Sequence, residues 1–134
     1  MSETLYPPLQ SRLENDVLVC VLGAEQMQGD ELMDALRQEL LAEVAKTNAK
    51  KVVLDFQRVR YLGSAGFRPL LSLYRKLKES GGRMIFVHLA PDLEEVFHIT
   101  KLLRSAANTT APFEAAPDLA GATARFAEAT PATN

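Results

Sequence analysis

Residues 51–80 read KVVLDFQRVRYLGSAGFRPLLSLYRKLKES and combine a short apolar run, a turn of small residues and an amphipathic segment. The apolar run extends from Val52 to Phe56 and is interrupted only by Asp55. A strand that is covered on both faces of an α/β sheet has this nearly continuous apolar pattern. We therefore predict an interior strand at residues 51–56.

The amphipathic segment after the turn has the period of a helix. Its apolar residues recur at spacings of three and four, so one face is predicted to be buried: Phe67, Leu70, Leu71, Tyr74 and Leu77. Ser64 is predicted to be the N-cap, because a hydroxyl there accepts a hydrogen bond from unpaired backbone N–H groups. The same position suits a phosphorylated serine, since the phosphate would meet those N–H groups and the positive end of the helix dipole. The local pattern leaves both roles of Ser64 open.

Toward the N-terminus the pattern predicts a β-hairpin followed by a helix. The expected elements are strands at residues 9–13 and 16–22, a loop at 23–29 and a helix at 30–46. The turn pair Asn15-Asp16 separates the two strands, and the second strand is rich in β-branched residues. Residues 1–8 contain Pro7-Pro8, which disfavours helix and central strand, so a flexible arm is expected there.

Beyond residue 80 the alternation of elements continues. The expected order is a helix stop at Ser80-Gly81-Gly82, a strand at 83–89, a short helix from Pro91, an edge strand at 111–114, a final helix at 117–129 and a flexible tail at 130–134. On the final helix, Leu119 and Phe126 are expected to face inward. Alternating strands and helices predict an α/β layer fold.

The composition is that of a single globular domain. The 134 residues are 47% hydrophobic and 24% charged, with a formal net charge of −2. This suffices for one packed core, expected at about residues 9–129, and gives no basic surplus for nucleic acid. No apolar run approaches the ~20 residues of a membrane span, and the first residues lack a secretory signal, so a cytoplasmic protein is expected. The single cysteine, Cys20, is expected to be a buried core residue.

Three segments together resemble the STAS domain, the fold of bacterial anti-sigma factor antagonists and of the cytoplasmic part of sulphate transporters. The first is Tyr61-Leu62-Gly63-Ser64-Ala65-Gly66-Phe67, where the family has an aromatic-apolar pair and then Asp-Ser-(Ser/Thr)-Gly-Leu opening a helix. The others are Gly81–Val87, similar to the family's Gly-Gly turn and strand, and Pro91–Leu102, similar to its next short helix. The resemblance covers most of residues 10–128. It implies a four- to five-stranded mixed sheet with helices largely on one face.

The resemblance also implies that the chain works by binding another protein. In the antagonists that it resembles, the serine opening this helix is phosphorylated by an anti-sigma factor that is also a serine kinase, and Ser64 is the matching residue. The unmodified form binds this partner and the phosphorylated form is released, a partner switch that regulates transcription. The partner-binding candidates are Gly63, Ala65, Gly66 and Arg68, with Glu25 and Gln26 from the loop after the second strand.

Two residues depart from the family pattern. Gly63 stands where the family has aspartate, and Ala65 stands where serine or threonine is usual. A further acidic position of the family, in the loop after the second strand, falls on Gln26 or Glu25. Ser64 therefore has fewer acidic neighbours than the matching serine of the family. This motivates a second hypothesis, an accessory or scaffold subunit of a transport or stress-signalling assembly in which no phosphorylation occurs.

No catalytic or metal-binding pattern accompanies these segments. A nucleophile elbow needs glycine two residues before the serine, and that position is Leu62. His88, expected on a strand, and His98, expected on a short helix, are typical of packed or surface histidines. Gly81-Gly82 lacks the Lys-(Ser/Thr) of a phosphate loop. We expect no enzymatic activity, no cofactor and no metal.

Overall fold

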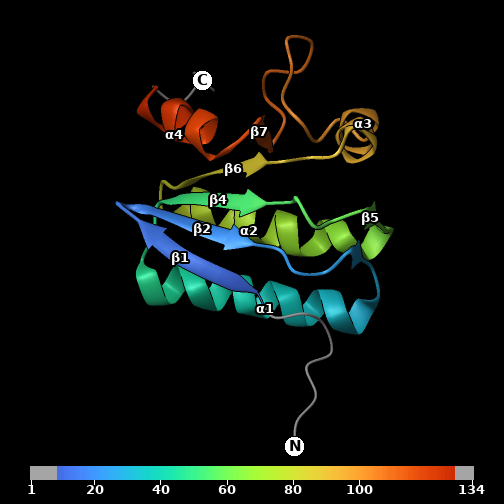
Figure 1. The fold of residues 1–134 in the computed structure, drawn as a ribbon, viewed down its shortest axis with the longest axis horizontal. Helices are drawn as coiled ribbons and strands as arrows, with labels where there is room; N and C mark the ends of the chain where they lie inside the picture. The colour runs from blue at the N-terminus through green and yellow to red at the C-terminus, as the bar shows by residue number, and fades with distance from the viewer. Residues whose placement is uncertain (1–8, 129–134) are drawn as a thin grey trace, which may run out of the picture.

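The computed structural model describes residues 9–128, so the arm at 1–8, the tail at 130–134 and Ala129 of the predicted last helix lie outside the described residues. A five-stranded sheet organises the chain (Figure 1). Its strands, in spatial order, are β1 (Gln10–Glu14), β2 (Val17–Val21), β4 (Lys51–Asp55), β6 (Arg83–Val87) and β7 (Glu114–Ala116). The helices are α1 (Asp30–Thr47), α2 (Phe67–Glu79), α3 (Pro91–Ile99) and α4 (Leu119–Ala127), and the 3-10 turn η1 (Ser64–Gly66) precedes α2.

The sheet is mixed, as the resemblance to the STAS domain implies. The hairpin of β1 and β2 is antiparallel, and Asn15 takes the left-handed conformation at its turn, with φ of 58°. The strands β2, β4, β6 and β7 are parallel to one another. Parallel neighbours require crossover connections, and α1, α2 and α3 supply them in turn. The central strand β4 confirms the interior strand predicted at residues 51–56.

The two faces of the sheet bury different sets of side chains, because successive residues of a strand point to opposite sides. One face packs against α1, α2 and α3 through Leu18, Cys20, Val52, Leu54, Met84 and Phe86. The other packs against α4 through Val17, Val19, Val53, Ile85 and Val87. Leu119 and Phe126 of α4 lie against this second cluster, which confirms their predicted orientation, and Cys20 is fully buried. Three helices on one face and one on the other agree with the expected arrangement.

Several local predictions are wrong. Two short strands, β3 (Gln26–Met27) and β5 (Tyr61–Leu62), pair with each other where loops are predicted, because a two-residue strand carries no periodicity signal. His88 follows β6 in the left-handed conformation instead of lying on the strand. The edge strand β7 begins at Glu114, where the prediction ends. On α2 the fully buried residues include Leu73, whereas Tyr74 is half-buried.

Candidate functional site

Ser64 is the first residue of η1 and is exposed to solvent. The N-cap position of this turn belongs to Gly63, and no side chain caps either η1 or α2. The prediction that Ser64 caps the helix is therefore wrong, although helical structure does begin at this residue. Because its hydroxyl group is not used to hold the turn, it is accessible to another molecule.

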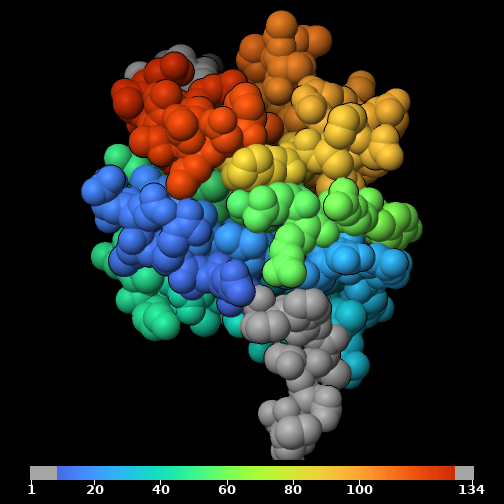
Figure 2. Space-filling model, viewed as in Figure 1, coloured from blue at the N-terminus to red at the C-terminus, as the bar shows by residue number. Residues whose placement is uncertain are grey.

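The paired strands β3 and β5 bring the Glu25 loop to the turn at Ser64. The Glu25 carbonyl accepts hydrogen bonds from the backbone N–H groups of Arg60 at 2.7 Å and Tyr61 at 3.1 Å. The Gly63 N–H donates to the Met27 carbonyl at 2.9 Å. Two segments separated by more than 30 residues thus form one surface. Figure 2 shows both at the right-hand edge of the molecule, the light-blue segment beneath the light-green one.

Gln28 joins this surface although the sequence analysis does not single it out. A β-carbon added at Gly63 would lie 3.1 Å from Gln28 Cβ, so the two residues are immediate neighbours. The Gln28 side-chain amide donates a hydrogen bond to Gln26 Oε1 at 2.6 Å. A polar strip of Glu25, Gln26 and Gln28 therefore borders the turn at Ser64. Only the pairing of β3 with β5 places Gln28 there, so a motif in the sequence could not have indicated it.

Gly66 holds the serine turn against this strip. A β-carbon at Gly66 would come within 2.6 Å of Leu62 Cδ1 and 2.7 Å of the Met27 carbonyl oxygen. Such distances are too short for real β-carbons, so Gly66 is required for close packing and not for an unusual backbone angle. Among the predicted partner-binding residues, Gly63, Ala65, Gly66, Glu25 and Gln26 lie together around Ser64.

Arg68 lies one helical turn beyond Ser64, beside a groove between α1 and α2. The groove has a volume of about 310 Å³, and Arg37, Arg68 and Arg75 contribute to its walls. Arg68 forms an exposed ion pair with Asp30, and Arg37 donates to Asp34 Oδ1 at 3.0 Å. The hydrogen bond from Arg37 lowers the pKa of the Asp34 carboxyl below its usual 3.8. The charged residues that line the groove are three arginines and one aspartate, Asp34.

Tyr61 adds an apolar element to the serine surface. Its side chain is 51% exposed, which makes it one of the few large hydrophobic residues in the described chain that face solvent. Aromatic residues with an apolar ring and a polar hydroxyl are enriched at protein interfaces. The exposed ring, the polar strip and the arginine groove together form a mixed surface of the kind that protein partners contact.

A second polar pair lies at the carboxyl ends of β4 and β6, and the sequence analysis does not predict it. His88 Nδ1 is 3.0 Å from Asp55 Oδ1, and the same oxygen accepts the Gln57 N–H at 2.9 Å. Asp55 is buried at the end of β4, and the left-handed backbone of His88 turns its ring toward that carboxylate. The pair satisfies a buried charge and fixes the ends of two strands.

Within residues 9–128 there is no group of three or more histidine, cysteine, aspartate or glutamate side chains that could hold a metal ion. The same part of the chain contains no helix with the length and apolar character needed to cross a membrane.

The chain is similar to a known domain family and to a named protein. The family model described as the STAS domain matches residues 32–116. A Bordetella bronchiseptica protein named BtrV, a candidate anti-sigma factor antagonist, is 32% identical over 92 residues, which cover 69% of this chain and 76% of BtrV.

Solved structures show the same fold. An anti-sigma factor antagonist from Mycobacterium paratuberculosis has a TM-score of 0.68 and 24% identity, over 92% of this chain and 100% of that one. The Bacillus cell fate determinant SpoIIAA in its phosphorylated form has a TM-score of 0.61 and 17% identity, over 89% of this chain and 99% of that one.

Proposed function

Because the chain belongs to the STAS domain family, we propose that it acts as an anti-sigma factor antagonist, a cytoplasmic protein-binding module without enzymatic activity of its own. Its partner in this proposal is an anti-sigma factor that is also a serine kinase. The observation that carries the proposal is the exposed hydroxyl of Ser64, which forms no cap and lies on a mixed polar and aromatic surface. The name of the BtrV relative supports the same class.

Phosphorylation of Ser64 would act as the switch through charge. A phosphate adds about −1.5 to −2 charges and three acceptor oxygens at neutral pH. In the free protein, the first turn of η1 and water would solvate this charge. In a complex, the partner would cover Tyr61 and the turn, and a buried phosphate without a matched cation is strongly unfavourable. Phosphorylation is therefore expected to release the partner.

The arginine groove supports a partner whose contacting face carries carboxylates. Arg68 lies close to Ser64 in sequence and already pairs with an exposed aspartate, so an acidic side chain of a partner can replace Asp30 at little cost. Rim charges of this kind influence the rate of association and the choice of partner more than affinity.

The experiment begins with co-purification of the partner from the native host and mass spectrometry of Ser64. The purified partner is then incubated with ATP and wild type, Ser64→Ala or Ser80→Ala. Ser80 is the control, because it is an exposed serine at the opposite end of α2 and its hydroxyl donates to the Leu77 carbonyl. We expect labelling of wild type and Ser80→Ala and none of Ser64→Ala. Labelling that survives in Ser64→Ala would refute the assignment.

Gly63 supports the alternative, a STAS accessory or scaffold subunit of a transport or stress-signalling assembly that is not phosphorylated. Aspartate is absent at this position, so no carboxylate next to Ser64 can orient its hydroxyl for phosphoryl transfer. The two proposals differ in the response of the purified partner to Ser64→Asp. A weaker complex favours the antagonist, whereas equal affinity for wild type and Ser64→Asp favours the accessory subunit.

A further inference from the structure

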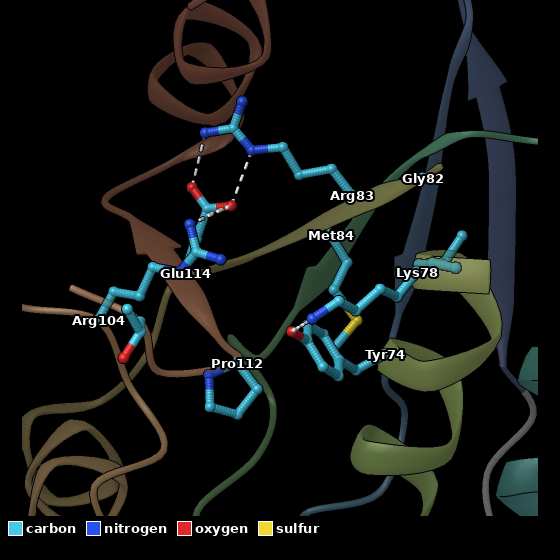
Figure 3. A pocket seen from close by; sticks show the side chains of 10 residues that line it. Tyr74, Lys78, Gly82, Arg83, Met84, Arg104, Pro112 and Glu114 are labelled. Carbon is cyan, nitrogen blue, oxygen red and sulfur yellow. Dashed lines mark hydrogen bonds and ion pairs between the residues drawn. The ribbon is translucent and has the colours of Figure 1, made fainter. Parts of the chain in front are cut away.

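A cavity of about 290 Å³ lies at the end of α2 that is far from Ser64. Figure 3 shows its lining, with Tyr74 and Lys78 from α2 on one side and Arg104 and Glu114 on the other. The first residues of β6 form the wall between them. This cavity shares no residue with the surface around Ser64, and the inference below does not depend on the proposed function.

One buried carboxylate in this region is fully engaged by one arginine. Glu114, only 4% exposed, accepts two hydrogen bonds of 2.7 Å from Arg83, through Nε and Nη2. The remaining Arg83 nitrogen, Nη1, donates to the backbone carbonyls of Arg125 and Glu128 at the end of α4. The pairing with Glu114 raises the pKa of Arg83, so Arg83 stays charged. Arg83 is therefore a structural residue, and each of its three guanidinium nitrogens donates a hydrogen bond within the protein.

Arg104 is a second arginine at the same carboxylate, and one of its nitrogens makes no hydrogen bond among the described residues. Its Nε donates to the Ala111 carbonyl at 2.8 Å, which fixes the side chain in place. Its Nη1 forms a long ion pair of 3.5 Å with Glu114 Oε2, and this buried nitrogen makes no hydrogen bond within residues 9–128. A buried guanidinium donor without a partner is costly. Two arginines therefore share one buried glutamate, and Arg104 has the weaker pairing.

Lys78 adds a further positive charge at the mouth of the cavity, and the rest of the wall is largely apolar. Lys78 Nζ lies 3.4 Å from the Tyr74 hydroxyl and 5.6 Å from the centre of its ring. Tyr74, Met84 and Pro112 contribute the apolar surface. Small-molecule sites combine such an apolar lining with a few fixed polar groups.

We propose that this cavity binds a small organic anion. Its carboxylate or phosphate group lies against Arg104 and Lys78, and its apolar body packs on Tyr74 and Met84. Arg104 is the positioned cation, because Nε is already anchored and Glu114 is occupied by Arg83. The volume admits a molecule of about the size of one aromatic ring with an acidic group.

The test uses the full chain and NMR titration of its backbone amides with four probes: phenyl phosphate, benzoate, benzyl alcohol and inorganic phosphate. We expect saturable shifts at Gly82, Met84 and Arg104 with phenyl phosphate or benzoate, and weaker binding of benzyl alcohol and inorganic phosphate. The better of the two aromatic acids identifies the acidic group. Absence of saturation with both aromatic acids, or equal binding of benzyl alcohol, overturns the proposal.

Two variants test the cations. Arg104→Gln is expected to weaken binding of the preferred aromatic acid by about 10- to 100-fold, the usual effect of a lost charge-assisted hydrogen bond. Because Arg104 is largely buried, Lys78→Gln is the second variant, with an expected loss of about two- to fivefold. Lys76→Gln is its matched control, since Lys76 is also exposed near the end of α2 but does not line the cavity. Equal losses in Lys78→Gln and Lys76→Gln, or unchanged affinity in folded Arg104→Gln, contradict the proposed site.

Discussion

At the scale of single residues, Ser64 and Asp118 show two different uses of a polar side chain at the start of a helix. Asp118 is the N-cap of α4 and accepts a hydrogen bond from the Gly121 N–H at 2.8 Å. Ser64 lies inside η1, after Gly63, and its hydroxyl group caps nothing. A side chain that does not hold its own helix is available for modification without loss of the fold.

This difference leads to a stability prediction. Ser64→Ala should change the free energy of unfolding by less than about 0.5 kcal/mol, the usual effect of a surface substitution. Asp118→Ala should lower it by about 0.5–2 kcal/mol, because a cap hydrogen bond is lost. Urea unfolding of both variants measures the two values. A clear loss of stability in Ser64→Ala would show that the serine supports its helix after all.

At the scale of elements, the strand β4 connects both halves of the core. Its side chains alternate, so Leu54 packs toward α1 and α2 while Val53 packs toward α4. The β3–β5 pair has a different role. It is short and lies outside the main sheet, but it fixes the strip of Glu25, Gln26 and Gln28 beside Ser64.

Because β4 is the central strand, shortening one of its buried side chains is expected to lower the free energy of unfolding strongly. Leu54→Ala should lower the free energy of unfolding by about 2–5 kcal/mol, because the fully buried side chain leaves a hole between the sheet and the helices. Leu13→Ala is the matched control on the edge strand β1, where the leucine is 54% exposed, and should cost much less. Equal urea midpoints for the two variants would contradict the assignment of the core.

At the scale of the whole molecule, the described chain presents two separate regions along α2. The exposed serine and the proposed partner surface lie just before the start of this helix, and its end borders the cavity with Arg104 and Lys78. The core between them contains no charged side chain at its centre and one thiol, Cys20. Burial raises the pKa of Cys20 from 9.0 to about 12, with a smaller contribution from the charge of Glu43.

The raised pKa of Cys20 couples global stability to alkaline pH. Between about pH 9 and 12 the unfolded chain loses the thiol proton while the folded chain retains it, so the free energy of unfolding falls as pH rises. The additional slope is about 1.4 kcal/mol per pH unit at most. We expect wild type to lose stability faster than Cys20→Ala in this range and at the same rate at pH 6–8. Parallel curves above pH 9 would contradict the buried position of the thiol.

The amino-acid sequence alone predicted much of the architecture. The apolar run at residues 51–56 and the three-four spacing on α2 are local patterns, and a pattern that repeats within one element predicts that element. The family motif around Ser64 likewise lies in one continuous segment, so a candidate site could be proposed there before any contact was known. The mixed sheet was implied by the resemblance to the STAS domain, whereas the register of its strands is known only from the structure.

Contacts between distant segments determined the rest, because their energy depends on which surfaces meet and not on local spacing. Gln28 reaches the serine turn only through β3 and β5. Likewise, Arg83 and Glu114 are 31 residues apart, and their bidentate pairing is what leaves Arg104 without a full set of partners. A buried polar network forms or fails by tertiary geometry, which no periodicity in the chain encodes.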